Sequence, residues 1–337
     1  MSAAGPDQPS ALLEIRNLRI VFADEEGVEF AAVDGIDLNV WPGRTLGIVG
    51  ESGCGKSVTA LSVMGLVPQP PGRIAAGSIV FEGVDLTSLP AHAMRELRGD
   101  RIAMIFQEPM TSLNPAYTVG DQIVEGIRRH RAMDRDEAQR LAIDMLRHVH
   151  IPSPEQRFHE YPHRLSGGMR QRVMIAMALA CKPKLLIADE PTTALDVTIQ
   201  AQILDLMRML RAQTGTAIIL ITHDLGVVAE LADDVCVMYA GRIVERASVA
   251  ALFAEPQHPY TIGLLGSIPR LDLVQDRLAA IEGQVPNPRA RVSGCRFHPR
   301  CPFGDERCAR EEPPVIDVGG GHRAACWKVP LDAVEAA

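Results

Sequence analysis

The chain has 337 residues, of which 47% are hydrophobic, 23% charged and 4% aromatic, and its formal net charge is -8. This length is enough to bury a large core in two or three domains. The acidic balance and the lack of a long basic block exclude nucleic acid as a general partner. No apolar run reaches the roughly 18 residues that a membrane-crossing helix needs, and the N-terminus lacks a signal-peptide pattern. We therefore expect a cytosolic protein unless a membrane partner holds it.

Strand patterns dominate the first quarter of the chain. Residues 12–22 and 30–40 alternate apolar and polar side chains, as half-buried antiparallel strands do. Residues 47–49 are predicted to form a buried strand that leads into a glycine-rich loop, followed by a helix from residue 56 to about residue 66. Strand-like patterning returns at 78–86.

The glycine-rich loop at residues 50–57 matches the pattern G-x-x-x-x-G-K-S between a predicted strand and a predicted helix. Its glycines let backbone N–H groups point at phosphate oxygens, and the helix N-terminus adds positive potential. Lys56 would reach the β- and γ-phosphates, and Ser57 would bind Mg²⁺. The strand–helix context favours this interpretation over a chance glycine-rich turn. The expected nucleotide contacts are Gly50, Glu51, Ser52, Gly53, Cys54, Gly55, Lys56 and Ser57.

The middle of the chain combines a short strand, a charged helical region and an unusual turn. The strand is predicted to end at Gln107, and the helical periodicity of residues 119–149 indicates a small helical subdomain inserted in the core. The turn Ser166-Gly167-Gly168 then opens an apolar helix, so backbone N–H groups collect at a second anion-binding position. A serine N-cap alone would explain the helix start but not the two glycines after it.

Two further apolar segments, residues 184–188 and 217–221, are predicted to be core strands of a parallel sheet. The first is followed by Asp189 and Glu190, and the second leads to His223. Doubly wound α/β folds bind their ligands at this carboxyl edge of the sheet. Asp189 suits the Mg²⁺ shell, and Glu190 suits the polarisation of an attacking water. The two acids would equally well cap the following helix, and a lone histidine is more often structural than catalytic.

In this order the motifs resemble those of the ATP-binding subunit of an ABC transporter, over about residues 12–248. The resemblance implies a P-loop α/β core in which a parallel sheet carries an antiparallel β-subdomain and a helical subdomain inserted at about residues 110–168. It identifies residues 50–57 with the Walker A loop and residues 165–171 with the signature. All six motifs of the family are present, which implies a subunit that hydrolyses ATP.

The resemblance also implies catalytic roles. Gln107 matches the Q-loop glutamine, His223 the switch histidine, and Glu190 the acid that ends Walker B. These three are the expected catalytic residues of the ATPase. Mg²⁺ would be held by Ser57, Gln107 and Asp189.

Further positions are expected to contact the nucleotide. Phe22 matches the aromatic that stacks on adenine, Phe30 is a weaker match, and Asp196 belongs to the D-loop at residues 194–196. The turn at 166–168 would face the γ-phosphate that is bound to the Walker A loop of an opposing subunit. ATP would therefore be enclosed between two ATPase subunits.

Beyond residue 249 the sequence becomes rich in proline, with nine of the 24 prolines between residues 256 and 314. We place a domain boundary near residues 245–255 and expect a loop-like, cysteine-rich extension over 249–337. The tripeptide His-Pro-Tyr at 258–260 and the segment Pro-Arg-Cys-Pro at 299–302 resemble the C-terminal extension of the oligopeptide/dipeptide importer ATPases.

This second resemblance implies a subunit that powers the uptake of di- and oligopeptides. Its expected partners are a sibling ATPase subunit, two membrane permease subunits and an extracytoplasmic substrate-binding protein, and no nucleic acid. The subunit would lie on the cytoplasmic face of the membrane, attached through the permease subunits. Nickel or another small solute is the alternative cargo.

Four of the seven cysteines crowd the extension with the spacing C-x5-C-x6-C-x17-C. In a reducing cytosol such a cluster is more often a metal site than a disulfide framework. The spacing matches neither the short pairs of structural zinc nor a ferredoxin run. The resemblance implies a [4Fe-4S] cluster, while zinc and the absence of a metal stay open, with His298 and His322 as substitute ligands. The expected ligands are Cys295, Cys301, Cys308 and Cys326.

Other classes of protein share parts of this pattern. Soluble ABC ATPases of DNA repair and chromosome maintenance insert a long coiled coil between Walker A and signature, whereas about 110 residues without a heptad run separate them here. Translation-acting relatives carry two tandem ATPase units, and this chain has one. A regulator that senses redox state or metal through its tail is a further alternative.

Overall fold

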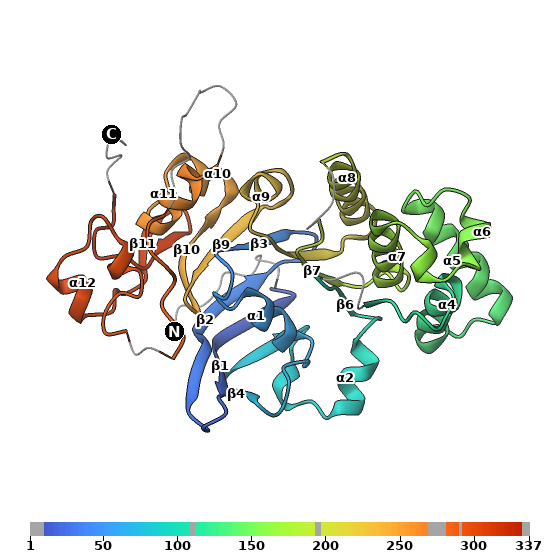
Figure 1. Cartoon of the computed structure of the whole chain (residues 1–337), viewed down its shortest axis with the longest axis horizontal. Helices are drawn as coiled ribbons and strands as arrows, with labels where there is room; N and C mark the ends of the chain where they lie inside the picture. The colour runs from blue at the N-terminus through green and yellow to red at the C-terminus, as the bar shows by residue number, and fades with distance from the viewer. Residues whose placement is uncertain (1–9, 108–111, 193–196, 269–280, 290–291, 332–337) are drawn as a thin grey trace. The chain divides into compact units, whose positions relative to one another are not determined.

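The computed structural model describes residues 10–107, 112–192, 197–268, 281–289 and 292–331 (Figure 1). The chain forms two compact units. Apart from the gaps just given, unit 1 contains residues 10–13, 40–45 and 88–221, and unit 2 contains residues 14–39, 46–87 and 222–331. Within the described ranges, no helix is long and apolar enough to cross a membrane.

Three parallel strands form the centre of unit 1: β6 (Ile102–Ile105), β7 (Leu185–Asp189) and β8 (Ala217–Ile221). Leu185 pairs with Ile102 on one side and with Ala217 on the other. Every residue of β7 and β8 is buried, as expected for parallel strands that are covered on both faces. The core strands predicted at 184–188 and 217–221 are therefore confirmed.

Helices make up most of the rest of unit 1. The helix α2 (Ala91–Leu97) precedes β6, α7 (Gly167–Leu179) precedes β7, and α8 (Val197–Thr214) follows β7 in the chain and leads to β8. The helical region predicted at 119–149 is confirmed as α4 (Val119–His130) and α5 (Arg135–His148). The helix α6 (Pro154–Phe158) and the 3₁₀ turn η2 (Pro162–Arg164) follow. The start of α5 is fixed by a reciprocal capping box between Asp134 and Glu137.

Unit 2 contains most of a four-stranded sheet with the order β2-β1-β4-β5. Its strands are β1 (Leu13–Ala23), β2 (Glu29–Val40), β4 (Gly72–Phe81) and β5 (Val84–Asp85). Buried and exposed positions are interleaved along β1 and β2, because only one face of the sheet packs on a core. This confirms the strands predicted at 12–22 and 30–40.

A second set of strands in unit 2 is hydrogen-bonded in the order β3 (Thr45–Val49), β9 (Asp234–Tyr239), β10 (Arg242–Ser248), β12 (His322–Ala324) and β11 (Ile316–Gly319). The strands β3 and β9 are parallel, and the remaining neighbours are antiparallel. The helices of this unit are α1 (Lys56–Val63), α9 (Leu225–Leu231), α10 (Val249–Ala254), α11 (Pro259–Gly266) and α12 (Glu306–Arg310), with 3₁₀ turns at η1 (Leu86–Ser88) and η3 (His298–Arg300).

The extension beyond residue 249 is more regular than its composition predicts. The helices α10, α11 and α12 and the strands β11 and β12 replace much of the expected loop, and β12 pairs with β10 through Glu245 and Ala324. The loop-like expectation is wrong for these segments because their order comes from tertiary contacts. The buried Glu245 carboxylate accepts hydrogen bonds from the backbone N–H groups of Gln257 and His258, and it pairs with Nε2 of His322 at 2.7 Å. The boundary near 245–255 stays a prediction.

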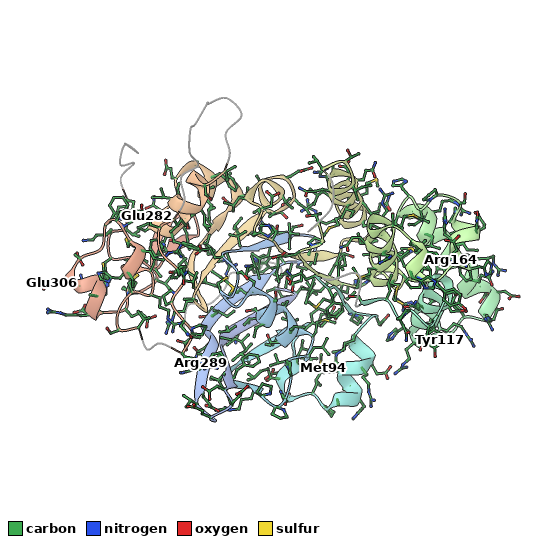
Figure 2. The ribbon with its side chains drawn as sticks, in the orientation of Figure 1. Met94, Tyr117, Arg164, Glu282, Arg289 and Glu306 are labelled. Carbon is green, nitrogen blue, oxygen red and sulfur yellow. The ribbon has the colours of Figure 1, made fainter. Side chains whose placement is uncertain are left out.

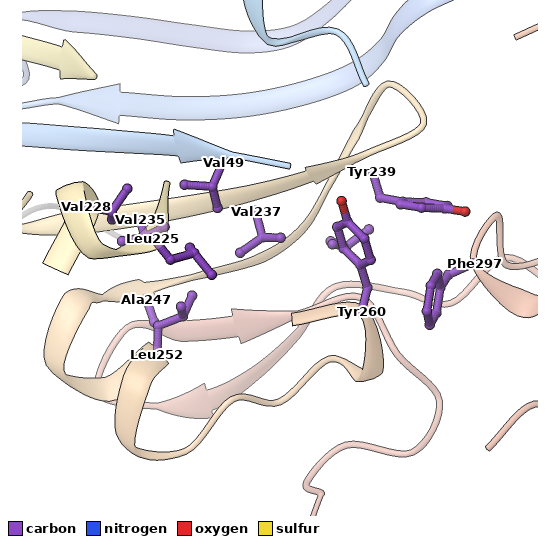
Figure 3. Close-up of a cluster of buried hydrophobic side chains, with 11 residues drawn as sticks. Val49, Leu225, Val228, Val235, Val237, Tyr239, Ala247, Leu252, Tyr260 and Phe297 are labelled. Carbon is purple, nitrogen blue, oxygen red and sulfur yellow. The ribbon is translucent and has the colours of Figure 1, made fainter. Parts of the chain in front are cut away.

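Aromatic side chains of the extension complete a core of unit 2 (Figure 3). Tyr260 is fully buried, and its ring centroid lies 4.6 Å from the ring centroid of Tyr239. The ring centroid of Phe297 lies 5.2 Å from that of Tyr239. Ring pairs at these separations contribute about 0.5–1.5 kcal/mol beyond their buried area. The extension is therefore bound to β9 by large apolar side chains. The cluster contains Val49, Leu225, Val228, Val235, Val237, Tyr239, Val244, Ala247, Leu252, Tyr260 and Phe297.

Candidate nucleotide site

The loop at residues 50–57 connects β3 to α1, as the sequence predicts. Gly50, Gly53 and Gly55 have φ angles of 148°, 79° and 102°, which side-chain-bearing residues rarely adopt. A Cβ atom on Gly50 would lie 2.2 Å from the Met238 carbonyl oxygen, and one on Gly55 would lie 2.6 Å from the Ala32 carbonyl oxygen. The path of this loop against β9 and β2 therefore requires glycine at both positions.

The side chain of Lys56, near the end of the loop, reaches back to the backbone at the start of the loop. Its Nζ donates hydrogen bonds to the carbonyl oxygens of Gly50 at 2.6 Å and Glu51 at 3.0 Å, and the residue is 7% exposed. The neighbouring Cys54 is fully buried, and burial raises the pKa of its thiol despite the nearby Lys56 ammonium. Cys54 therefore acts as a neutral packing group, and the charge available to a phosphate in this loop comes from Lys56.

The two aromatic candidates for adenine stacking lie together in unit 2. The rings of Phe22 and Phe30 are stacked with centroids 6.2 Å apart and an interplanar angle of 24°. Arg289, which Figure 2 labels, places its guanidinium 5.9 Å from the centre of the Phe30 ring. Phe30 thus carries a cation on one face. The predicted role of Phe22 in stacking on adenine stays a prediction.

Two of the three predicted catalytic residues meet in unit 1. Asp189 is the last residue of β7 and is 3% exposed, and Glu190 follows it with a φ of 48°. Oε2 of Glu190 accepts a hydrogen bond from Nε2 of Gln107 at 3.2 Å, and the Glu190 N–H donates to the Ile221 carbonyl oxygen. A left-handed conformation costs a residue with a side chain roughly 1–2 kcal/mol. Such strain is concentrated at functional sites, and here it falls on the predicted catalytic acid.

The signature turn starts α7. The Ser166 side chain caps the helix by accepting a hydrogen bond from the Met169 N–H at 3.4 Å, so the serine N-cap interpretation is confirmed. It does not account for Gly167, because a Cβ atom there would meet no described atom within 4 Å. Further along α7, the buried Gln171 donates to the Pro191 carbonyl oxygen at 2.6 Å. This contact joins the signature helix to the segment that follows Glu190.

His223 is exposed in unit 2, just before α9. Its neighbour Asp224 is structural, since Oδ1 of Asp224 caps α9 by accepting from the N–H groups of Gly226 and Val227. The predicted catalytic role of His223 stays a prediction. Asp196 lies outside the described residues.

The sequence does not reveal that the extension contacts the phosphate loop. Arg300 forms a paired ion contact with the Glu51 carboxylate, and the Tyr260 hydroxyl accepts the Glu51 N–H at 2.8 Å. Both contacts span more than 200 positions of the chain. Tyr260 and Arg300 do belong to the two marker segments at 258–260 and 299–302, and that was the only available signal.

The four cysteines of the extension line one cavity of about 10 Å³, together with His298. This volume corresponds to about one water-sized sphere. The pKa of the Cys301 thiol is raised to about 11, by burial and by the neighbouring thiols of Cys326, Cys295 and Cys308. Within the part of the chain that the structure describes, no group of three or more His, Cys, Asp or Glu side chains is arranged to hold a metal ion. The metal thus stays a prediction.

His322 is a poor substitute ligand for this cavity. It is not among the lining residues, and it is occupied by its contact with the buried Glu245. His298 lines the cavity together with the four cysteines, so it lies where a substitute metal ligand would have to be.

The sequence matches two protein families. Residues 33–193 match the family described as "ABC transporter", and residues 244–308 match the family described as "Oligopeptide/dipeptide transporter, C-terminal region".

Among curated proteins, the chain is 55% identical to the probable peptide ABC transporter ATP-binding protein y4tR of Sinorhizobium fredii, over 94% of this chain and 95% of that protein. It is 53% identical to the oligopeptide transport ATP-binding protein AppD of Bacillus subtilis, over 94% and 97% of the two chains. It is 50% identical to the dipeptide transport ATP-binding protein DppD of Escherichia coli, over 96% and 98%.

Solved structures give the same answer for the fold. The dimeric structure of MJ0796, a bacterial ABC transporter cassette, superposes with a TM-score of 0.64 at 26% identity and covers 70% of this chain and 98% of its own. The post-hydrolysis state of MJ0796 bound to ADP and Pi gives a TM-score of 0.64 at 25% identity, with the same coverage. These matches support the predicted ATPase cassette with its mixed sheet and helices.

Proposed function

Because the chain belongs to the ABC transporter ATP-binding proteins and carries the C-terminal region of their oligopeptide/dipeptide branch, we propose that it hydrolyses ATP to power peptide uptake through an ABC importer. The observation that carries the proposal is the similarity to peptide-transport ATP-binding proteins, which extends over nearly the whole of both chains. It includes the extension as well as the ATPase cassette. The relatives' names favour peptides over nickel or another small solute.

We assign the nucleotide chemistry to the following residues. The N–H groups of residues 50–57 and the ammonium of Lys56 bind the phosphates. The Ser57 hydroxyl, the Gln107 side-chain oxygen and the Asp189 carboxylate have the oxygen donors that Mg²⁺ prefers. These three residues would hold Mg²⁺, which would supply positive charge against the negative charge that develops during phosphoryl transfer.

Glu190 polarises the attacking water, and Gln107 and His223 assist it. The contact between Gln107 and Glu190 supports this assignment, because it orients the acid from a neighbouring strand end. The positive φ of Glu190 directs its side chain away from the path of a regular strand. Phe22 and the D-loop residue Asp196 complete the nucleotide contacts of the proposal.

The signature turn at 166–168 serves the nucleotide of a second ATPase subunit. The open space around Gly167 supports this, since its own chain gives no reason to exclude a side chain there. The N–H groups at the start of α7 would approach a γ-phosphate held by the partner's Walker A loop. We propose a sibling ATPase as this partner, beneath two permease subunits that receive peptide from an extracytoplasmic binding protein. The chain would then be peripheral to the cytoplasmic face of the membrane.

We further propose that the four thiols of the extension hold a [4Fe-4S] cluster. The donor set suits the group, since four cysteines already surround one cavity and iron–sulfur clusters take four thiolates. The proposal rests on this donor set, because the cavity itself admits only one water-sized sphere.

Uptake into membrane vesicles tests the peptide assignment. The chain is co-expressed with candidate permease and sibling ATPase subunits, and ATP-dependent uptake of labelled di- and oligopeptides is compared with uptake of Ni²⁺. Peptide uptake that disappears with Lys56→Ala supports the proposal. Uptake of Ni²⁺ without peptide, or a chain that never enters the membrane fraction with its partners, contradicts it.

A further inference from the structure

Among the described arginines of the extension, Arg300 makes the most side-chain hydrogen bonds. Its five N–H groups make five hydrogen bonds with donor–acceptor distances of 3.4 Å or less, and the side chain is only 3% exposed. Nε donates to the Glu282 carbonyl oxygen, and one terminal nitrogen donates to the Ile281 carbonyl oxygen and the other to the Tyr239 hydroxyl. Figure 2 labels Glu282 on this part of the chain. A buried guanidinium held in this way has a fixed position.

The same guanidinium binds the carboxylate of Glu51 through two hydrogen bonds. The two terminal nitrogens of Arg300 lie 2.6 and 3.0 Å from Oε2 and Oε1 of Glu51. The Glu51 hydrogen bond also raises the pKa of Arg300, which stays charged. The rings of Tyr239 and Phe297 have their centres about 6 Å from the guanidinium carbon and help to bury Arg300, whereas the Glu51 side chain is 32% exposed. A paired arginine–carboxylate contact is both stronger and more directional than a single hydrogen bond.

Glu51 is the second residue of the phosphate loop, and every part of it is engaged. Arg300 holds its carboxylate, the Tyr260 hydroxyl accepts its N–H at 2.8 Å, and Lys56 donates to its carbonyl oxygen at 3.0 Å. The loop around it contains three glycines with positive φ, which make an untethered loop costly to order. The extension therefore fixes the loop at its second residue, close to the end of β3.

Charge gives a second reason for the contact. A carboxylate within a loop that binds phosphate repels its ligand by Coulomb interaction, and more strongly where solvent is excluded. The Arg300 guanidinium cancels this charge. Without Arg300, Glu51 would carry an uncompensated negative charge in the phosphate loop, and this charge would repel the phosphates.

We propose that Arg300 is a positioning residue of the nucleotide site, which holds Glu51 and neutralises it so that residues 50–57 bind the phosphates of MgATP. The inference rests on the proposed ATPase function. It makes the C-terminal extension a part of the nucleotide site as well as a marker of the transporter branch. Tyr260 supports the same loop through the backbone.

The test compares binding of MgATP and MgADP to the purified full-length chain by titration calorimetry. Arg300→Met keeps the length and apolar stem of the side chain but removes all five donors, and we expect nucleotide affinity to fall about tenfold. Adding Glu51→Gln to Arg300→Met should restore most of that loss, because the repelling carboxylate is gone. A purely structural role of Arg300 predicts no such recovery.

Arg307 offers a matched control in α12 of the same extension. It also pairs with a glutamate, Glu311, and lies over an aromatic ring, that of Trp327. Arg307→Met should leave nucleotide affinity within twofold of the wild type. Melting temperatures of all variants report any general loss of stability.

The outcomes separate cleanly. If wild-type protein binds MgATP but Arg300→Met binds it equally well, or if the double variant is weaker than Arg300→Met, the inference is wrong while the ATPase function stands. If the wild type binds no nucleotide, both fail. Should Arg300→Met not fold, Arg300→Lys keeps the charge without the paired geometry, and an affinity unchanged from the wild type would overturn the inference in the same way.

Discussion

Nε2 of Gln107 donates to Oε2 of Glu190 at 3.2 Å, joining two residues that are 83 positions apart in the chain. The contact exists because β6 and β7 are parallel neighbours, so the residues that follow them emerge at the same edge of the sheet. It combines an amide donor with an acid whose backbone is strained, at the position expected for the attacking water.

Replacing Glu190 by glutamine should preserve MgATP binding and abolish steady-state hydrolysis. Glutamine keeps the shape and the contact to Gln107 but cannot polarise a water as a carboxylate does, so the ATP-bound dimer should accumulate. Nucleotide titration, phosphate release and size-exclusion chromatography in MgATP measure these effects. Multiple turnovers by the pure variant would refute the catalytic role. Asp205→Asn on the exposed surface of α8 should retain wild-type turnover.

Gly167→Ala tests whether the signature turn meets a second subunit. A Cβ at Gly167 meets no described atom within 4 Å, and the φ of Gly167 is not positive, so the isolated chain should keep its stability within about 1 kcal/mol. ATP hydrolysis by the assembled complex should nevertheless fall more than tenfold, since the added methyl group would obstruct the approach of the γ-phosphate.

Gly126→Ala is the matched control for that variant. Gly126 is also helical, also without a positive φ, and a Cβ there likewise meets nothing within 4 Å. It should leave both stability and hydrolysis unchanged. If Gly167→Ala hydrolyses ATP as well as Gly126→Ala does, the signature turn does not approach a partner's nucleotide.

The buried His258 should make the fold sensitive to acid. Burial lowers the pKa of His258 from 6.5 to about 3, and Nδ1 of His258 accepts a hydrogen bond from the Tyr260 N–H, which requires the neutral ring. The unfolded chain therefore binds more protons than the folded chain between these two pH values. The contribution to stability is complete above about pH 6.5 and falls by about 1.4 kcal/mol per pH unit as the pH drops toward 3.

His258→Asn should remove this part of the acid sensitivity. The asparagine side-chain oxygen replaces Nδ1 as the cap of α11 and does not titrate. Denaturant unfolding at pH 7 and pH 5 measures the difference, which should shrink by about 2 kcal/mol in the variant. An equal loss of stability in both proteins would show that another group is responsible.

Iron content tests the cluster proposal for the extension. Wild-type protein purified without oxygen should be brown and contain iron, and Cys301→Ser should lose both the colour and the iron because one of four thiolates is missing. Cys181→Ser is the control, since Cys181 is buried in unit 1 and does not line the cavity. Colourless, iron-free wild-type protein would rule the cluster out.

Local patterns predicted much of the nucleotide site. The path of residues 50–57 depends on the φ angles of its own glycines, and the start of α7 depends on a serine one residue before it. The end of the buried strand β7 is also predictable, because an uninterrupted apolar segment stops at Asp189 and Glu190. Such features are recoverable from sequence because their causes lie within a few residues of one another.

The structure of the extension was less predictable. The segments β11 and β12 are only four and three residues long, so their periodicity is too short to be recognised. They become strands because β12 pairs with β10 and β11 pairs with β12, and because His322 reaches the buried Glu245. Proline-rich composition indicated loops, while Pro259 in fact occupies the first turn of α11, where proline is favoured.

The sequence by itself predicted a phosphate loop, a catalytic acid and a signature turn, and it contains the marker segments of one transporter branch. Only the tertiary structure decided that the marker segments contact the phosphate loop. Arg300 and Glu51 are separated by 249 positions, and neither has a local pattern that depends on the other. Their contact arises because α11 and the segment around Phe297 pack on β9, which brings Arg300 next to Glu51.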